Sequence, residues 1–336
     1  MFAAASPAKE VIMAQNIDTP YITDPALRKQ LEESVTGKMR YTLMNDFLAK
    51  YGLQKDLFAL KGLLAALLEL PLDSITDIQI MNPTEPSGVI RDKDCILDIK
   101  LELNHGKLVN IEIQSNFQEF WANRSVTYMS KMFDNLREGD NYDRVKACVH
   151  IGILDFALYE QGSADRTKEF YSDYRILNTK THHGFTDNFV IKALMLGNME
   201  NASREQKEDY GSVYYWAKLF KAKTWEELRM IAKNNERMES LVNTASRLSV
   251  DRSVQEACES RIMHRLDINT LEHRIQERDL TIDTYLHRLQ KKEEMIESLE
   301  QDMQKKDEII ESQTSMLAKK EDELQKLRQK LAQYEG

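Results

Sequence analysis

The stretch that decides the fold is residues 95–115, CILDIKLELNHGKLVNIEIQS, which reads as two strands around a short turn. Apolar and polar residues alternate on both sides of Asn104-His105-Gly106, as expected for strands with one buried face. Yet Asp98 lies in the middle of the first strand and Glu112 in the middle of the second, where carboxylates are uncommon. These two acids either belong to a solvated face or are placed together to hold a ligand.

The register of this hairpin decides whether Asp98 and Glu112 meet. A two- or four-residue loop sets Asp98 against Ile113 and mixes apolar with polar partners. A three-residue loop, with Gly106 in the left-handed conformation, gives one coherent apolar face and sets Asp98 opposite Glu112. The other pairs expected in this register are Leu103 with Lys107, Leu101 with Val109, Lys100 with Asn110, Ile99 with Ile111, Leu97 with Ile113, and Ile96 with Gln114.

Two interpretations of the opposed carboxylates remain open from spacing alone. Directly opposite side chains have Cβ atoms about 5 Å apart, so two carboxylates there repel each other. A divalent cation converts this repulsion into ligation, because hard cations take carboxylate oxygens. Alternatively, the acids lie on an exposed face and are screened by water and by Lys100.

The segments around the hairpin predict an α/β fold with a mixed central sheet flanked by helices. Residues 145–158 form a continuous apolar run, typical of a central strand buried on both faces. We expect a disordered N-terminus over 1–20, a globular domain over 21–235, a helical connector over 236–267 and a coiled coil over 268–336. The other expected elements are helices over 54–70 and 117–139, strands over 74–83, 170–178 and 187–196, and helices from 203 onward.

The C-terminal segment is predicted to be a coiled coil because apolar residues recur at spacings of three and four from Ile268 onward. A fourteen-residue repeat underlies the pattern, and no Gly or Pro interrupts it before Gly336. One line of positions is wholly apolar, whereas the second is polar at every other position in its middle. The first line is Leu289, Ile296, Met303, Ile310, Leu317, Leu324 and Leu331, and the second is Tyr285, Lys292, Leu299, Lys306, Gln313, Lys320, Leu327 and Tyr334.

Composition limits the class of protein. The chain has 336 residues and a net charge of −9, which argues against a generally basic nucleic-acid coat protein but leaves room for a local basic groove. Cys95, Cys148 and Cys258 lie too far apart in sequence for a zinc motif and are expected to be reduced thiols. No apolar run is long enough to span a membrane. We therefore expect a cytoplasmic protein with no membrane partner.

Several separate stretches resemble one bacterial family, in the family's order. These are RYTLMNDFLAKYGLQKD (40–56), GLLAALLEL (62–70), RDKDCILDIKLELNHGKLVNIEIQ (91–114), RSVTYMSKMFDNLREGDNYDRVKACVHIGILDF (124–156) and YYWAKLF (214–220). Over residues 38–235 the chain resembles the recombination-promoting nuclease and putative transposase family of the PD-(D/E)XK superfamily. The resemblance implies a restriction-endonuclease-like core and a metal-dependent endonuclease acting on DNA.

The resemblance also implies roles for individual residues. Asp98 and Glu112 match the two acids that hold Mg²⁺ or Mn²⁺, and Asp46 matches the leading acid of the family. Asp92 and Lys93 match the pair before the first strand. Gln114 departs from the superfamily pattern, which often has a Lys at this position. An amide can orient a water but carries no positive charge. We expect Lys100, on the same strand face as Glu112, to supply the positive charge that Gln114 lacks.

Local cations are needed for an acidic chain to bind DNA. Arg124, on the helix after Gln114, matches the family's RS-x-x-Y and is the better candidate for a phosphate contact, whereas Tyr128 is expected to pack on the sheet. Lys50 and Lys93 are further candidates for DNA contact. His150 is expected to be a hydrogen-bonded core residue. The full basic set is Lys50, Arg91, Lys93, Lys100, Arg124 and Lys131.

Three functions remain open at this point. The first is a Mg²⁺- or Mn²⁺-dependent DNA endonuclease that promotes recombination and forms a homodimer through the coiled coil. The second is a catalytically weak nuclease-fold protein that binds DNA or partners through the coiled coil. The third is a nuclease that acts on RNA.

Overall fold

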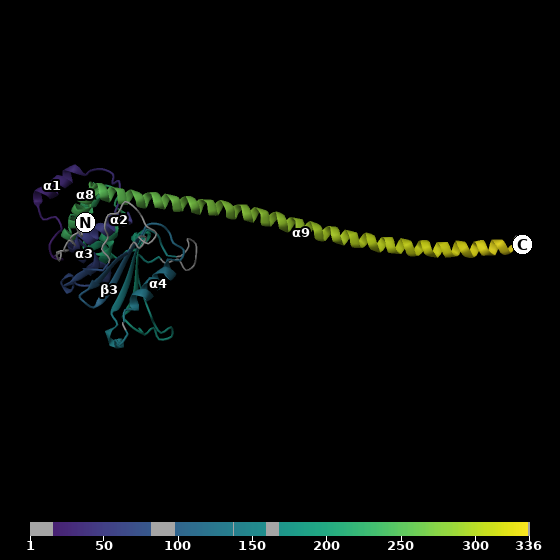
Figure 1. The fold of residues 1–336 in the computed structure, drawn as a ribbon, viewed down its shortest axis with the longest axis horizontal. Coiled ribbons are helices and arrows are strands. Elements are labelled where there is room, and N and C mark those ends of the chain that lie inside the picture. Colours follow the sequence, from purple (N-terminus) through teal and green to yellow (C-terminus); the bar gives the residue numbers. More distant parts are fainter. Residues whose placement is uncertain (1–15, 82–97, 137, 159–167, 335–336) are drawn as a thin grey trace, which may run out of the picture. The chain divides into compact units, whose positions relative to one another are not determined.

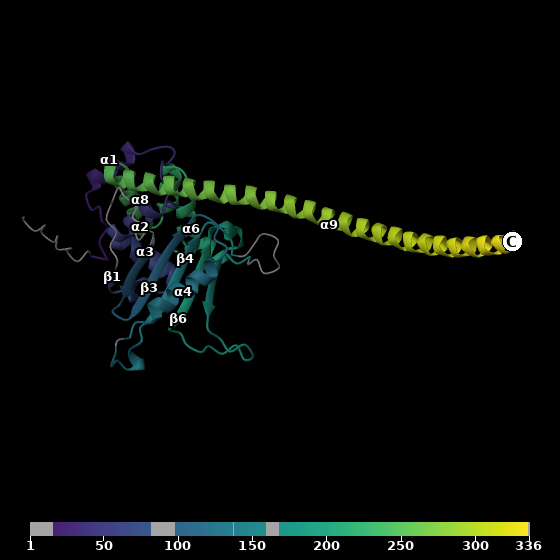
Figure 2. The same cartoon turned by 45° about the vertical axis from the view of Figure 1, so that its right-hand side comes forward.

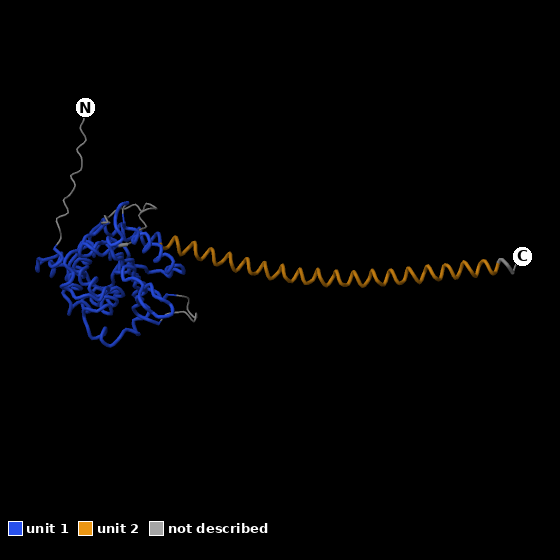
Figure 3. Tube along the Cα trace, turned by 90° about the horizontal axis from the view of Figure 1, so that it is seen from below, with its two compact units in different colours: residues 1–264 blue, residues 265–336 orange. Residues whose placement is uncertain are grey.

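The computed structural model describes residues 16–81, 98–136, 138–158 and 168–334, without the side chains of Asp98 and of residues 332–334. The chain divides into two compact units, Met1–His264 and Arg265–Gly336 (Figure 3). Each unit is described by itself below.

A mixed sheet forms the centre of the first unit, as the sequence predicts (Figure 1). In the described residues six strands lie in the order β1-β2-β3-β4-β6-β5. β3, β4 and β6 run parallel in the middle, and the remaining neighbours pair antiparallel. The strands are β1 Ile78–Ile80, β2 Asp98–Leu103, β3 Lys107–Gln114, β4 Ala147–Leu154, β5 Tyr171–Arg175 and β6 Phe189–Met195.

The register expected for the hairpin is confirmed over the described residues: Asp98 pairs with Glu112, Lys100 with Asn110, and Leu103 with Lys107. The pairs expected for Ile96 and Leu97 lie outside the described residues. The expectation for the turn is wrong in one respect, because Gly106 is not left-handed. Instead Asn104 and His105 have φ of 51° and 54°, and the Gly106 N–H donates to the Leu103 carbonyl at 3.2 Å. Positive φ at both central residues is the pattern of a type I′ turn, which suits a twisted hairpin.

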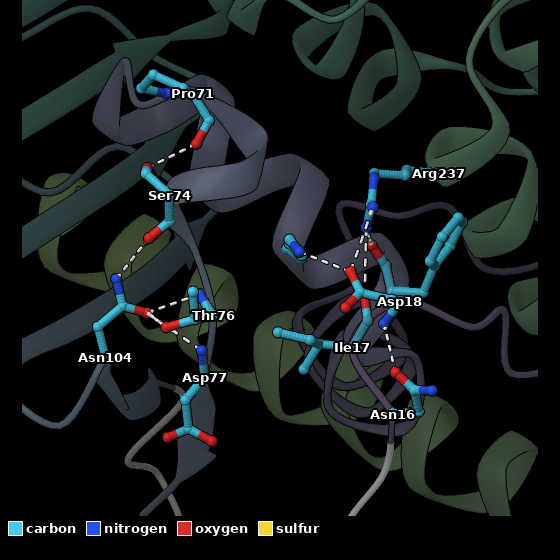
Figure 4. Close-up of polar contacts among 11 residues, drawn as sticks. Asn16, Ile17, Asp18, Pro71, Ser74, Thr76, Asp77, Asn104 and Arg237 are labelled. Atoms are coloured by element: carbon cyan, nitrogen blue, oxygen red, sulfur yellow. Dashed lines mark hydrogen bonds and ion pairs between the residues drawn. The ribbon is translucent and has the colours of Figure 1, made fainter.

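Asn104 explains why the turn tolerates this geometry. Asn is among the few residues other than Gly that adopt the left-handed conformation readily, and its side chain is fully used here. Its Oδ1 accepts from the backbone N–H groups of Thr76 at 2.8 Å and Asp77 at 3.1 Å, and its Nδ2 donates to the Ser74 carbonyl at 2.7 Å (Figure 4). The turn is thereby tied to the chain that leads into β1.

Helices cover both faces of the sheet (Figure 2). α4, Trp121–Phe133, lies on one face and buries Trp121, Ser125 and Met129, which recur at the helical spacing of four. α2 Asp46–Lys55, α3 Leu57–Leu68, α6 Val213–Lys221 and α8 Glu236–Ser249 contribute to the apolar core on the opposite face. The remaining elements are α1 Pro25–Ser34, α5 Arg204–Glu208, α7 Trp225–Ala232, α9 Arg252–Tyr334, and the 3-10 turns η1 Leu72–Ser74, η2 Tyr142–Arg144 and η3 Leu196–Asn201.

Asp56 breaks the helix expected over 54–70 into α2 and α3, because it caps α3 instead of continuing α2. Its buried carboxylate accepts from the Ala59 N–H at 3.0 Å, from the Ser240 hydroxyl at 2.7 Å and from the Thr244 hydroxyl at 2.8 Å. Burial raises the pKa of the Asp56 carboxyl, and the hydrogen bonds from Ser240, Ala59 and Thr244 oppose that rise. Asp56 thus fastens α8 to the corner between α2 and α3.

Two expected boundaries therefore move. α8 lies within the segment expected to be a connector, yet it buries Met238, Leu241 and Val242 in the core, and the compact unit ends at His264 rather than at 235. At the other end, residues 16–18 were expected to be disordered. Asp18 instead lies 2.6 Å from Lys61 and 3.9 Å from Arg237 (Figure 4), while residues 1–15 lie outside the described part of the chain.

The second unit is the continuation of α9. Every residue from Leu266 to Leu331 is exposed on the single chain. No helix in the described ranges is both long and apolar enough to cross a membrane. The helix itself is as expected, whereas its pairing into a coiled coil stays a prediction.

We expect Asp56→Ala to lower the free energy of unfolding by about 2–4 kcal/mol, because α3 loses its cap and two buried hydroxyls lose their acceptor. The matched control is Asp24→Ala, which removes the exposed cap of α1, whose Asp24 Oδ1 accepts from Ala26 N–H at 2.9 Å. That change should cost about 0.5–1 kcal/mol. Urea unfolding followed by circular dichroism gives both values, and equal losses would show that Asp56 has no role beyond capping.

Candidate functional site

Glu112 is the centre of the candidate site. It lies near the end of β3, between Asp98 on β2 and Gly152 on β4 in the register of the sheet, and its side chain is 0% exposed. A charged carboxylate in this position costs several kcal/mol unless it is compensated. The residues around Glu112 supply that compensation.

Two cationic or polar groups contact the Glu112 carboxylate. The Arg124 Nη2 lies 3.0 Å from Oε1, and the His150 Nε2 lies 3.5 Å from Oε2. Within the described residues, neither oxygen has a partner that meets hydrogen-bond geometry. The charge of Glu112 is therefore balanced by Arg124, while its oxygens keep unused capacity to accept a further bond.

His150 on β4 is oriented by Asn110 on β3. The Asn110 Nδ2 lies 3.0 Å from the His150 Nδ1, and the His150 Nε2, on the other side of the ring, faces the Glu112 carboxylate at 3.5 Å. The expectation of a buried core histidine is confirmed, but its contact with Glu112 was missed. The sequence indicates only that Asn110 and Glu112 share one face of their strand. Placing His150 beside them requires the pairing of β3 with β4, which the sequence does not give.

α4 supplies the remaining walls of the site. Its Trp121 and Tyr128 rings lie 6.0 Å and 6.3 Å from the His150 ring, measured between centroids. The Arg124 guanidinium lies 5.2 Å from the Tyr128 ring centre and also donates to Gln118 Oε1 at 3.1 Å. Arg124 is 29% exposed, so it is partly accessible from solvent. Its expected contact with a DNA phosphate stays a prediction.

Gly152 makes room for Trp121 next to Glu112. A Cβ atom at Gly152 would lie 2.2 Å from the Trp121 Cζ2, far inside van der Waals contact. Trp121 is itself 1% exposed, so its ring has little space into which it can move. The residue beside Glu112 on β4 must therefore be glycine as long as position 121 carries an indole.

Gln114 and Lys100 lie on the same strand face as Glu112, as expected from the register. The Gln114 amide nitrogen donates to the Asn116 carbonyl at 3.4 Å, which points to a local contact at the end of β3. Lys100 is half-buried opposite Asn110. The chemical roles expected for both residues stay predictions.

Asp46 lies in the first turn of α2, beside the start of α9. Its Oδ1 accepts from the Phe47 N–H at 2.9 Å. Burial, followed by the charge of Asp46, raises the pKa of the Cys258 thiol to about 12. In the described part of the chain no hydrogen bond or ion pair joins Asp46 to Glu112.

The expected DNA contacts are placed unevenly. Lys50 is buried, with 6% exposure, so its ammonium does not lie on the open surface. Lys93 and Asp92 lie outside the described residues. Of the three DNA contacts expected from the sequence, Arg124 is the one that the structure places at the Glu112 site.

The donors at this site fit a hard divalent cation. The unused Glu112 oxygens are the ligand atoms that Mg²⁺ and Mn²⁺ prefer, and the backbone register sets Asp98 directly across from them. Over the described residues, no group of three or more His, Cys, Asp or Glu side chains is arranged to hold a metal. The Asp98 side chain lies outside the described part of the chain.

A mixed sheet flanked by helices, with an acid on each strand of its hairpin, is consistent with a PD-(D/E)XK nuclease core, and the comparison with protein families shows the family. The sequence profile of the PD-(D/E)XK nuclease family transposase matches residues 43–274. The chain belongs to this family. Neither the curated proteins nor the solved structures include a match to it.

We expect Gly152→Ala to lower the free energy of unfolding by about 1–3 kcal/mol, because the added methyl group overpacks the Trp121 ring. The control is Gly197→Ala, where a Cβ meets nothing within 4 Å and the change should cost little. Thermal unfolding of both variants measures the difference. A Gly152→Ala protein as stable as the Gly197→Ala protein would contradict the packing argument.

We expect Arg124→Ala to cost about 2–3 kcal/mol, because it leaves the buried Glu112 charge without its closest partner. Combining it with Glu112→Gln should recover most of the loss, since a neutral amide needs no counter-ion. The control is Arg144→Ala, whose exposed ion pair with Asp140 at 3.6 Å should be worth less than about 1 kcal/mol. Additive losses in the Arg124 and Glu112 variants, measured by urea unfolding, would rule out the coupling.

Proposed function

We propose that the protein is a divalent-metal-dependent endonuclease that hydrolyses phosphodiester bonds of DNA and promotes recombination. One observation supports this proposal above the others. A fully buried Glu112, whose oxygens keep unused acceptor capacity, lies opposite Asp98 in a chain of a nuclease family. An exposed acidic face, the alternative open from the sequence, does not agree with 0% exposure at Glu112.

Asp98 and Glu112 would hold the cation. Bound Mg²⁺ or Mn²⁺ activates a water at neutral pH and offsets the charge that develops on the phosphate. Arg124 and His150 fix the Glu112 carboxylate at the centre of the sheet, which keeps its oxygens at one position. This preorganisation is what electrostatic stabilisation of a transition state requires.

The remaining roles follow from position. Gln114, at the end of β3, would orient the attacking water through its amide, and Lys100 would supply the positive charge that Gln114 lacks. Asp46 would act as the third acid. Its support comes from the family motif, since α2 packs on the sheet face opposite Glu112 and no described contact links Asp46 to Glu112.

DNA is the proposed substrate despite the net charge of −9. Arg124 is partly exposed beside Glu112 and would meet a phosphate there, with Lys93 as a further expected contact. The buried Lys50 is not proposed as one. A cytoplasmic location and a homodimer formed through α9 complete this proposal.

The alternative is a catalytically weak nuclease fold that serves as a DNA-binding or coiled-coil interaction protein. Two observations favour it. Gln114 stands where the superfamily often has Lys, and Arg124 already occupies one side of the Glu112 carboxylate. Activity measurements separate this alternative from the nuclease.

We expect the full chain to nick supercoiled plasmid DNA with Mg²⁺ or Mn²⁺ and to stop when EDTA removes the ion. Asp98→Asn and Glu112→Gln should each reduce the rate by at least about 100-fold, because each removes a charged ligand of the cation. Gel electrophoresis measures the nicked fraction over time. RNA of equal length, used as the substrate in a parallel reaction, tests the third function, a nuclease that acts on RNA.

The matched control is Glu102→Gln, on the same strand face as Asp98. Glu102 pairs with Lys146 at 2.6 Å, and its loss should leave the rate within about twofold, as expected away from the reacting atoms. Lys100→Ala should slow nicking. Equal rates in the Asp98, Glu112 and parent proteins would contradict the site, and no nicking by the parent protein would favour the alternative function.

A further inference from the structure

The exposed face of α9 carries a continuous apolar line with no partner in the described residues of the single chain. Its members recur every seven residues and are between 38% and 64% exposed. An apolar stripe of this length is stable in water only when another helix covers it. The line consists of Ile268, Ile275, Ile282, Leu289, Ile296, Met303, Ile310, Leu317, Leu324 and Leu331.

The second line of the heptad pattern is interrupted by cations, and each of them is followed directly by an acid. In heptad terms the apolar line occupies the a positions, the second line the d positions, and these acids the e positions. Neutral residues fill the other d positions. The four cation and acid neighbours are Arg278 with Asp279, Lys292 with Glu293, Lys306 with Asp307, and Lys320 with Glu321.

This distribution distinguishes between the two orientations of a helix pair. In a parallel pair in register, a residues meet a residues and d residues meet d residues, so every a layer is wholly apolar and each of the four d cations faces its own copy. That repulsion has to be offset by acids beside the cations. Each d cation then packs beside the e acid of the other helix, because a knob from one helix fills a hole of four residues on its partner. In an antiparallel pair, a residues meet d residues. Each of the four cations would then be packed against Ile, Leu or Met.

The flanking charges agree with the parallel orientation. At the g and e positions that face each other across a parallel pair, three opposite-charge pairs form between the copies: Arg274 with Asp279, Arg288 with Glu293, and Glu323 with Arg328. Two like-charge pairs also form, Asp267 with Glu272 and Asp302 with Asp307. The repulsion in the second pair is reduced within each chain, since the Lys305 Nζ lies 3.9 Å from Asp302.

We propose that α9 pairs with α9 of a second copy of this chain as a parallel, in-register, two-stranded coiled coil. The cations in the second line then specify orientation and register, in the way that polar residues in a coiled-coil interface do. In each copy the first unit precedes the paired part of α9 in sequence. In a parallel pair both copies of the first unit are therefore connected to the N-terminal end of the coiled coil. The pairing does not depend on the nuclease activity, and its test needs no DNA.

The first test is disulfide trapping in the full chain. In a parallel, in-register pair the Leu331→Cys thiols face each other and oxidation yields a covalent dimer. In an antiparallel pair overlapping over Ile268–Leu331 they lie about 95 Å apart and yield none. The control is Gln329→Cys, on the outward face of the same turn. The parent protein sets the background from Cys95, Cys148 and Cys258.

Light scattering of the parent protein should give the mass of two chains. A single-chain mass, a mass of three or four chains, or a two-chain mass without Leu331→Cys trapping above the Gln329→Cys level would each overturn the proposal. Loss of DNA nicking would not. The coiled-coil pairing deepens the homodimer of the proposed function, and it fails separately from the proposed nuclease activity.

A charge exchange tests the register. Lys320→Glu should raise the dimer dissociation constant about fivefold to tenfold, because two like charges then meet at each side of one layer. Lys320→Glu combined with Glu321→Lys should restore the parent value, since the pair is rebuilt with opposite signs. The neighbouring g residue is Met316, so no other charge confounds the exchange. A double variant no tighter than the single one would contradict the contact between copies.

Discussion

A carboxylate buried in the middle of a sheet has to be compensated, and Glu112 imposes this requirement on two elements at once. β4 must carry His150 in register with Asn110, and α4 must lie at the angle that brings Arg124 to the carboxylate. Asp98, which β2 sets opposite Glu112, is a second acid and increases that requirement. Because desolvating one charge costs several kcal/mol, any packing that moves α4 away from the sheet is strongly disfavoured. The polar site and the position of α4 are therefore determined together.

The two faces of the sheet differ in composition and in role. The face toward α2, α3 and α8 is apolar and holds the main core, whereas the face toward α4 mixes Trp121 and Met129 with Glu112 and His150. Strand alternation produces this division, since successive side chains on β3 point to opposite faces. A shift of the hairpin by one residue would exchange the faces and place Ile111 at the site.

Sequence reasoning succeeds where a pattern is local and repetitive. The alternation in β2 and β3 was sufficient to predict their register, and the apolar run in β4 was sufficient to predict a central strand. It failed at Asp56, because leucine spacing does not reveal a cap whose partners, Ser240 and Thr244, lie far along the chain. His150 and the pairing of Arg124 with Glu112 were missed for the same reason, since both depend on contacts between distant segments. The turn was wrong because Asn104, rather than Gly106, adopts the left-handed conformation.

The contact between Gly152 and Trp121 has a consequence for how this site can change during evolution. The two positions share one volume, so a side chain can grow at one only if it shrinks at the other. Relatives with any β-carbon at position 152 are therefore expected to carry a smaller residue at position 121. Such an exchange would open space beside the acid on β3, and the shape of the pocket would vary while the acidic pair stays the same.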